Sequence, residues 1–347
     1  MASTIAHIQN QTHKTLMLTP AERDAISNTI NSVPGDYGRQ DFHEFYHDCR
    51  RAAGSLPARL TRAIFDFQLG RHAGYLLIKG LPLPHQVPPT PAARGQTWNQ
   101  ATLHARKAMC VVLSALGHIY NFTGKKHPDY IDDVFPIFSD RHEQLGTNQC
   151  FLEWHVEDGF HPAKADLVSL YCLRGDSNAK TYLCHARDLD LDPHHRQQLE
   201  QPNFLIQVDP TFVDGSQAEA VQRCTVLSPG QDPEIIYDPA YMTATSDAAE
   251  AALQHLRDRI EQRYQAITLE PGDLLVFDNR RSVHARSAYS PRFDGSDRWL
   301  LRGLVLESYW KTRESMQDLA HGFITGNEPV TPVKVADVVD ADQIQFA

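Results

Sequence analysis

The spacing of apolar residues changes near residue 134, and this change limits the possible folds more than any other feature of the sequence. Before it, apolar side chains recur at helical spacing, which predicts helices over residues 19–31, 40–53, 57–69 and 99–120. After it, short apolar runs separated by turn residues predict strands over residues 150–156, 166–173, 203–209, 223–227, 234–237, 273–278 and 299–307. Two segments depart from this order, an early strand over 75–79 and a late helix over 246–264. Helices followed by many strands indicate an α+β fold, and we expect a double-stranded β-helix (jelly roll) core braced by helices.

The length and charge of the chain limit its domain count and its partners. Its 347 residues fit one domain with insertions, for which we expect a mainly helical part over 1–70, a jelly-roll core with helical insertions over 71–325 and a tail over 326–347. A formal net charge of −10 without a basic block disfavours nucleic acid and anionic membranes as partners. Six cysteines without a Cys-x-x-Cys pair fit a reducing compartment. The sequence shows neither a signal peptide nor an apolar run of membrane-spanning length, so we expect a cytoplasmic protein; its oligomeric state is not predicted.

A His-x-Glu pair stands in the apolar-rich segment Phe151–Pro162, FLEWHVEDGFHP. If this segment is a strand, His155 and Glu157 point to the same face. An imidazole and a carboxylate are two thirds of the 2-His-1-carboxylate triad that holds non-haem Fe(II). Glu153 shares that face and competes as a ligand, whereas Asp158 lies on the opposite face of a regular strand. Because the chain has 18 histidines and 43 acidic residues, such pairs also arise by chance, and a hydrogen-bonded strand histidine beside a solvated carboxylate is the alternative interpretation.

A candidate third ligand, His284, comes after a Pro-Gly-Asp turn and an apolar strand, just beyond the end of that strand, where a sheet opens. Arg298 and Arg302 follow and, being four residues apart, face the same way on one strand. A guanidinium that faces a core needs an anionic partner. A dicarboxylate ligand would supply this partner through a bidentate pair. Surface salt bridges with Asp294 or Asp297 are the alternative.

Four segments together resemble one enzyme family. They are EWHVEDGFHP (153–162), ADLVSLYCLRGD (165–176), DNRRSVHARS (278–287) and PRFDGSDRW (291–299), and the strand GYLLIKGLP (74–82) agrees with them. In this order they resemble the clavaminate synthase-like branch of the Fe(II)/2-oxoglutarate oxygenases. That branch includes clavaminate synthase and hydroxylases of free arginine, asparagine and lysine. The resemblance runs from about residue 56 to residue 310.

The resemblance implies a set of site residues and a cover for the site. The implied roles are iron ligation by His155, Glu157 and His284, binding of the 2-oxoglutarate co-substrate by Arg298 and Thr181, and substrate binding by Asp238 and Arg302. In the family, the arginine that matches Arg298 pairs with the distal carboxylate of 2-oxoglutarate. The acidic residue that matches Asp238 contacts the side chain of the amino-acid substrate. A mobile lid insertion is implied over residues 209–222.

The implied activity is Fe(II)- and 2-oxoglutarate-dependent hydroxylation, with O2, of an unactivated C3 or C4 carbon of a free L-amino acid, as in the biosynthesis of antibiotics and other natural products. The arginine and lysine hydroxylases of this branch tend to carry a second acid two residues after the first, where this chain has Ala240. This departure disfavours arginine and leaves asparagine, glutamine, citrulline, lysine or a cyclic amino acid. Two other interpretations are the same chemistry on a peptide- or carrier-bound amino acid, and a non-catalytic jelly-roll binding protein. A zinc hydrolase could use two histidines and a glutamate, but it would give Arg298 no role.

Overall fold

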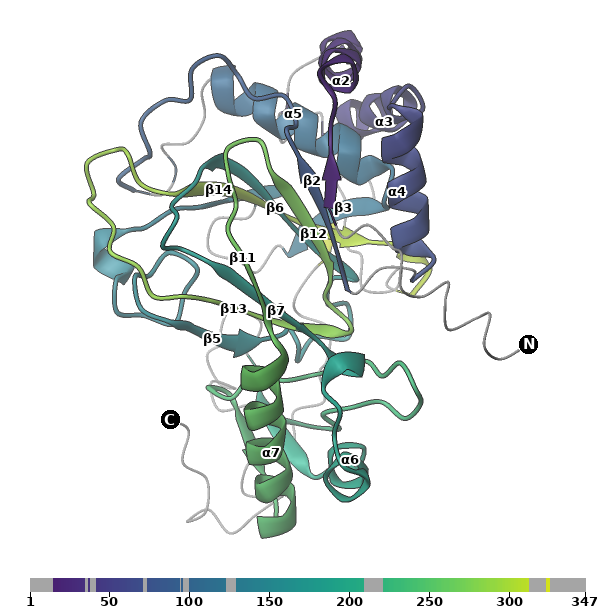
Figure 1. Ribbon diagram of the computed structural model, residues 1–347, viewed down its shortest axis with the longest axis vertical. Coiled ribbons are helices and arrows are strands. Elements are labelled where there is room, and N and C mark those ends of the chain that lie inside the picture. The colour runs from purple at the N-terminus through teal and green to yellow at the C-terminus, as the bar shows by residue number, and fades with distance from the viewer. Residues whose placement is uncertain are drawn as a thin grey trace.

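The computed structural model describes residues 15–34, 37, 42–70, 74–93, 95, 100–122, 129–208, 221–311 and 323–324, and the statements below concern these residues. They form a mixed fold of helices and sheets, in agreement with the α+β prediction (Figure 1). Among these segments, none of the helices has the length and apolar character that crossing a membrane requires.

Helices form the N-terminal part, as the sequence predicts. They are α2 (Pro20–Ser32), α3 (Phe42–Ala53), α4 (Ala58–Gln68) and α5 (Gln100–Ser114). Helix α2 begins where it does because Thr19 caps it. The Thr19 hydroxyl accepts from the Glu22 amide, and the Glu22 carboxylate accepts from the Thr19 amide, so each satisfies a donor that the helix end leaves free.

The largest sheet has eight strands and lies against these helices (Figure 1). Its order is β1 (Thr15–Met17), β2 (Tyr75–Lys79), β12 (Leu274–Asp278), β6 (Leu167–Arg174), β14 (Trp299–Leu306), β3 (His118–Phe122) and β15 (Phe323–Ile324), and β4 (Ile131–Val134) also pairs with β14. Side chains alternate between its two faces. In β6, for example, Tyr171 and Leu173 pack towards the helices, whereas Val168 and Leu170 pack towards the second sheet.

A second sheet of four strands faces the first. Its order is β11 (Gln265–Ile267), β7 (Thr181–His185), β13 (Ser282–Arg286) and β5 (Leu152–His155). Leu183 of β7 and Ile267 of β11 belong to the same apolar cluster as the inner residues of the large sheet, so the two sheets pack face to face. The space between them at the β5–β13 end is the cavity described below.

A third, smaller layer covers the outer face of the second sheet. It comprises the sheet β10 (Met242–Ala244), β8 (Phe204–Gln207), β9 (Val221–Cys224) and the helices α6 (Pro193–Leu199) and α7 (Asp247–Arg263). Short 3-10 turns occur at Phe138–Asp140, Ala186–Asp188 and Tyr309–Lys311. Val283 and Ala285 of β13 pack in one cluster with Leu256 and Ile260 of α7, which fixes β13 from its outer side.

The predicted helix over 99–120 is wrong at its C-terminal end. Helix α5 ends at Ser114, and His118–Phe122 is strand β3, which pairs with β14. Gly117 lies at the change, where a Cβ atom would come within 2.3 Å of the Leu306 carbonyl oxygen. Pairing with β14 therefore overrides a residue spacing that also suits a helix.

Other differences from the predicted elements are local. Residues 234–237 form no strand, and Ile235 makes only an isolated bridge with Leu227. Besides β3, the elements that were not predicted are helix α6 and strands β1, β4, β7, β10, β11, β13 and β15, and β9 covers 221–224 in place of the predicted 223–227. Of the predicted lid, residues 209–220 lie outside the described residues, and 221–222 begin strand β9. The tail over 326–347 also lies outside them.

Candidate metal centre

The structure pairs the two candidate histidine ligands across neighbouring strands. His155 is the last residue of β5 and His284 the central residue of β13, and they are direct partners in this antiparallel pair. Their ring centroids are 4.0 Å apart. His284 follows β12, as expected, but it lies within a further strand that the sequence did not predict. Directly opposed side chains on one face of a sheet are close neighbours, so β-pairing alone brings the two imidazoles together.

Glu157 reaches the histidines by a different route from the predicted one. Strand β5 ends at His155, and residues 157–160 form a turn, so the two residues do not alternate along one strand. A buried asparagine holds this turn. Asn279 accepts a hydrogen bond from the Glu157 amide at 2.9 Å and donates to the Glu157 and Ala165 carbonyl oxygens at 3.1 and 3.0 Å. The sequence prediction missed Asn279, although it stands in the DNRRSVHARS segment.

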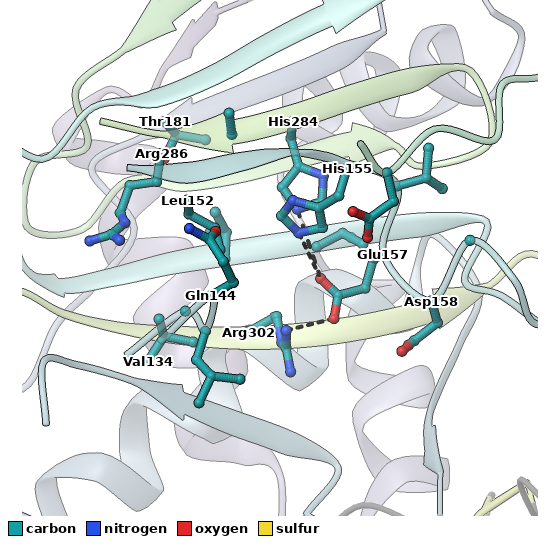
Figure 2. A pocket seen from close by; sticks show the side chains of 18 of the residues that line it. Val134, Gln144, Leu152, His155, Glu157, Asp158, Thr181, His284, Arg286 and Arg302 are labelled. Carbon is teal, nitrogen blue, oxygen red and sulfur yellow. Dashed lines mark hydrogen bonds and ion pairs between the residues drawn. The ribbon is translucent and has the colours of Figure 1, made fainter. Parts of the chain in front are cut away.

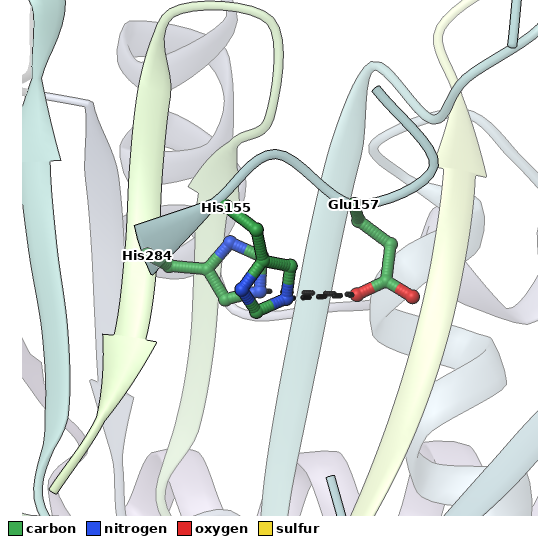
Figure 3. Close-up of side chains that lie close together, drawn as sticks. All are labelled: His155, Glu157 and His284. Atoms are coloured by element: carbon green, nitrogen blue, oxygen red, sulfur yellow. Dashed lines mark ion pairs between the residues drawn. The ribbon is translucent and has the colours of Figure 1, made fainter. Parts of the chain in front are cut away.

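Three ligand atoms converge in front of the second sheet (Figure 3). Oε2 of Glu157 is 4.0 Å from Nε2 of His155 and 3.8 Å from Nε2 of His284. The competing acids stand apart from this group. The Glu153 carboxylate faces Arg257 of α7 at 3.6 Å. Asp158 borders the cavity at a positive φ of 51°, in the turn rather than on a strand face.

A hydrogen bond orients the His155 ring and burial favours the neutral form of His284, and both Nε2 atoms are directed at the carboxylate. His155 Nδ1 lies 2.7 Å from the Glu153 carbonyl oxygen. That acceptor requires a proton on Nδ1, so Nε2 is the ring atom that faces the carboxylate. Burial and the neighbouring His155 lower the pKa of His284 well below its usual range, against the opposing effect of Glu157. Two neutral imidazoles and one carboxylate are the donor set that a divalent transition metal requires, so these residues fit an iron ion.

Arg302 binds the outer oxygen of the Glu157 carboxylate. Its Nη1 donates to Glu157 Oε1 at 2.6 Å (Figure 2). Its Nη2 donates to Asp132 of β4 at 2.8 Å. Burial opposes its charge, but Glu157 and Asp132 outweigh this effect and raise the pKa of Arg302. The sequence predicted that Arg302 faces the site and needs an anionic partner. In the structure its partners are the protein carboxylates of Glu157 and Asp132, in place of the expected ligand.

Arg298 has no such partner. It is 5% exposed and borders the cavity, and among the described residues it makes no hydrogen bond or ion pair. The expected alternative, a salt bridge with Asp297, is absent there, because the Asp297 carboxylate accepts from the backbone amides of Arg292 and Phe293. Burial lowers the pKa of Arg298. An anion is the natural ligand for a buried and uncompensated guanidinium.

The cavity that these residues enclose has a volume of about 470 Å³ (Figure 2). Thr181 of β7 lines it and is buried, as the partner of Arg286 in the β7–β13 pair. Asp238 lines it as well. Burial raises the pKa of Asp238 to about 6, against the lowering effects of His155 and of the Ala240 amide. The sequence prediction did not include four further polar residues that line the cavity: Gln144, Gln207, Tyr241 and Arg286.

A second group of possible ligands lies between α6 and α7. Asp192 caps α6 by accepting from the His194 and His195 amides, and its other oxygen contacts the rings of His195 and His255. These side chains are partly exposed, and the contacts within the α6–α7 pair account for the group without an ion.

Known proteins resemble this chain in both sequence and structure. The family described as "Taurine catabolism dioxygenase TauD, TfdA family" matches residues 99–304. L-lysine 3-hydroxylase of Catenulispora acidiphila is 31% identical over 86% of this chain and 86% of that protein. Clavaminate synthase 2 of Streptomyces clavuligerus is 29% identical over 80% of this chain and 87% of that protein. The structure of an asparagine oxygenase in complex with Fe(II), 2S,3S-3-hydroxyasparagine and succinate superimposes with a TM-score of 0.82 and 25% identity, over 90% of this chain and 99% of that chain.

Proposed function

The chain belongs to the taurine catabolism dioxygenase TauD, TfdA family, and from this membership we propose that it hydroxylates an unactivated side-chain carbon of a free L-amino acid, using Fe(II), 2-oxoglutarate and O2. The relatives confirm the amino-acid hydroxylase branch that the sequence resembles. One observation carries the proposal. A cavity bordered by two imidazoles and a carboxylate also contains a buried arginine that no described residue neutralises.

His155, Glu157 and His284 would hold the iron. When it is bound together with 2-oxoglutarate and O2, the iron supplies the oxidising power for attack on an unactivated C–H bond. With only these three protein ligands, the ion would remain open to small molecules. The residues around them orient those molecules and exclude water.

Arg298 and Thr181 would bind the co-substrate. The guanidinium offers a planar pair of donors to the distal carboxylate of 2-oxoglutarate, and the Thr181 hydroxyl adds a third. Both side chains are buried, so the pair forms away from water and positions the keto acid end towards the iron ligands. Arg302 would line the substrate side of the same cavity, and its Nε is buried without a hydrogen-bond partner among the described residues.

Asp238 would contact the side chain of the amino-acid substrate. Its buried carboxyl group, with a raised pKa, gains most from a ligand that donates hydrogen bonds or carries positive charge. Ala240 supplies no second acid, which disfavours a planar guanidinium as the partner. The relatives named above act on lysine and on asparagine, and an ammonium or amide group would suit a single carboxyl.

The finer architecture belongs to the same proposal. The eight-stranded and four-stranded sheets, packed face to face, support a double-stranded β-helix. We assign the whole chain to a single oxygenase domain, and residues 209–222 to a lid over the substrate.

The test has two steps. Anaerobic mixing of the protein with Fe(II) and 2-oxoglutarate is expected to produce a visible metal-to-ligand charge-transfer band, and absence of this band would refute the site assignment. A panel of free L-amino acids is then screened for succinate release and a product 16 mass units heavier. If the band forms but no free amino acid is turned over, the substrate is bound to a peptide or a carrier.

A further inference from the structure

We propose that Asp132 is a positioning residue for the metal site, which it governs through Arg302; this inference rests on the proposed function. Nothing in the sequence pattern pointed to Asp132, which does not border the cavity itself. Its influence passes through two consecutive ion pairs, from Asp132 to Arg302 and from Arg302 to the ligand Glu157.

Strand pairing places Asp132 and Arg302 together. They are direct partners in the antiparallel pair β4–β14, so their side chains stand on the same face of the sheet. Arg302 Nη2 donates to Asp132 Oδ2 at 2.8 Å, and Asn121 donates to Asp132 Oδ1 at 3.2 Å. One carboxylate oxygen is therefore anchored to β3 while the other holds the guanidinium, and the arginine has little freedom to turn.

The neighbouring residue, Asp133, does not contact Arg302. Asp133 points to the opposite face of the sheet, where it accepts hydrogen bonds from the Arg106 guanidinium and from the Trp299 indole. Two consecutive acids in β4 thus serve two different arginines. Asp133 pairs with Arg106 on the side of the helices, and Asp132 pairs with Arg302 on the side of the cavity.

Fixing Arg302 determines which oxygen Glu157 offers to a metal. Arg302 Nη1 binds Oε1 at 2.6 Å, and Oε2 lies towards the two imidazoles at 4.0 and 3.8 Å. A carboxylate held in this way would present Oε2 alone to an ion, because Oε1 is engaged by Arg302. Groups that orient metal ligands typically change metal affinity by about 10–100-fold when they are removed.

The test measures the affinity of metal-free protein for Co²⁺, a spectroscopic substitute for Fe(II), by anaerobic titration of its visible absorption. Asp132→Asn keeps the size of the side chain and removes the charge that holds Arg302. We expect the Kd for Co²⁺ to rise by about 10–100-fold, with a shifted absorption band. Asp133→Asn is the matched control, because it removes the same charge one residue away on the opposite face. It is expected to lower the melting temperature and to leave the Kd of the folded protein within about threefold of wild type.

A double-mutant cycle separates positioning from a direct charge effect. If Asp132 acts through Arg302, adding Asp132→Asn to Arg302→Met changes the Kd little; an undiminished effect in that background would overturn the proposal. An unchanged Kd in Asp132→Asn alone would also overturn it. Should that variant not fold, Asp132→Glu, which keeps the charge but displaces it, is expected to weaken Co²⁺ binding in the same direction, and wild-type affinity would overturn the proposal. Failure of the wild-type protein to bind Co²⁺ would instead reject the proposed metal site as a whole.

Discussion

Replacing Arg298 with methionine tests the candidate 2-oxoglutarate site most directly. Arg298 is 5% exposed, and no described residue forms an ion pair with its guanidinium. A desolvated charge without a partner opposes folding. Methionine retains most of the apolar bulk of the side chain and removes the charge. We therefore expect the Arg298→Met variant to melt at or above the temperature of the wild type.

The same change is expected to weaken 2-oxoglutarate binding strongly. Losing a charge-assisted, two-point contact in a buried site costs about 3 kcal/mol, which corresponds to a rise in Kd of about 100-fold. The assay is anaerobic titration of the Fe(II)-loaded protein with 2-oxoglutarate, followed through the visible charge-transfer band. The monocarboxylic keto acid 2-oxobutyrate chelates through the same atoms but lacks the distal carboxylate. Its Kd is expected to be the same in the variant and the wild type.

Arg292→Met provides the matched control. Arg292 lies in the same loop, with a side chain that is 64% exposed and 3.9 Å from Asp294. An exposed pair of this kind contributes little to stability, and we expect normal binding of both keto acids. A 2-oxoglutarate Kd within threefold of wild type in Arg298→Met would contradict the reasoning, and so would an equal loss for 2-oxobutyrate.

Three further predictions concern the same cavity. His284→Ala is expected to abolish the charge-transfer band, and Fe(II) added after chelator treatment should restore the band in the wild type only. Asn279→Ala removes three buried hydrogen bonds, two to Glu157 and one to the Ala165 carbonyl oxygen, and is expected to lower the unfolding free energy in urea by about 2–4 kcal/mol; a loss below about 1 kcal/mol would show that the turn is stable without Asn279. Because burial raises the pKa of Asp238 to about 6, the folded state binds this proton more tightly than the unfolded chain. The carboxyl thus supports folding at low pH and opposes it as pH rises through 6. Metal-free Asp238→Asn is therefore expected to be more stable than the wild type by about 1–2 kcal/mol above pH 6 and similar to it near pH 4 in thermal melts; a constant difference across this range would refute the shift.

Elements with local signals were predictable from the sequence. Thr19, Pro20 and Glu22 form a capping box that needs no distant partner, so the start of α2 was visible. Strand β13 carried no such signal. His284 and Arg286 interrupt its apolar pattern, and both are buried because they line the cavity between the two sheets. The end of α5 was likewise set from a distance, by the approach of Gly117 to Leu306.

The candidate ligands were visible in the sequence, whereas the geometry that unites them was not. His155 and Glu157 suggested a strand with one shared face. In the structure the strand ends between them, and Asn279 holds the following turn in place. A hydrogen bond between segments so far apart in the chain leaves no periodic trace. The residue types therefore pointed to the chemistry, and tertiary contacts decided how the atoms converge.

The two arginines of β14 and its leading loop show why charge in a sequence is not yet a binding site. Arg298 and Arg302 are four residues apart, a spacing that places both on one face of a strand. The sequence predicted an anionic partner for both. In the structure the two arginines differ in their ion pairs. Asp132 and Glu157 neutralise Arg302, whereas no described residue neutralises Arg298. A buried charge left without a partner is costly, and it persists where a ligand supplies the missing charge. The unpaired Arg298 is therefore the candidate anion site, and the paired Arg302 is the residue that holds the candidate ligand Glu157.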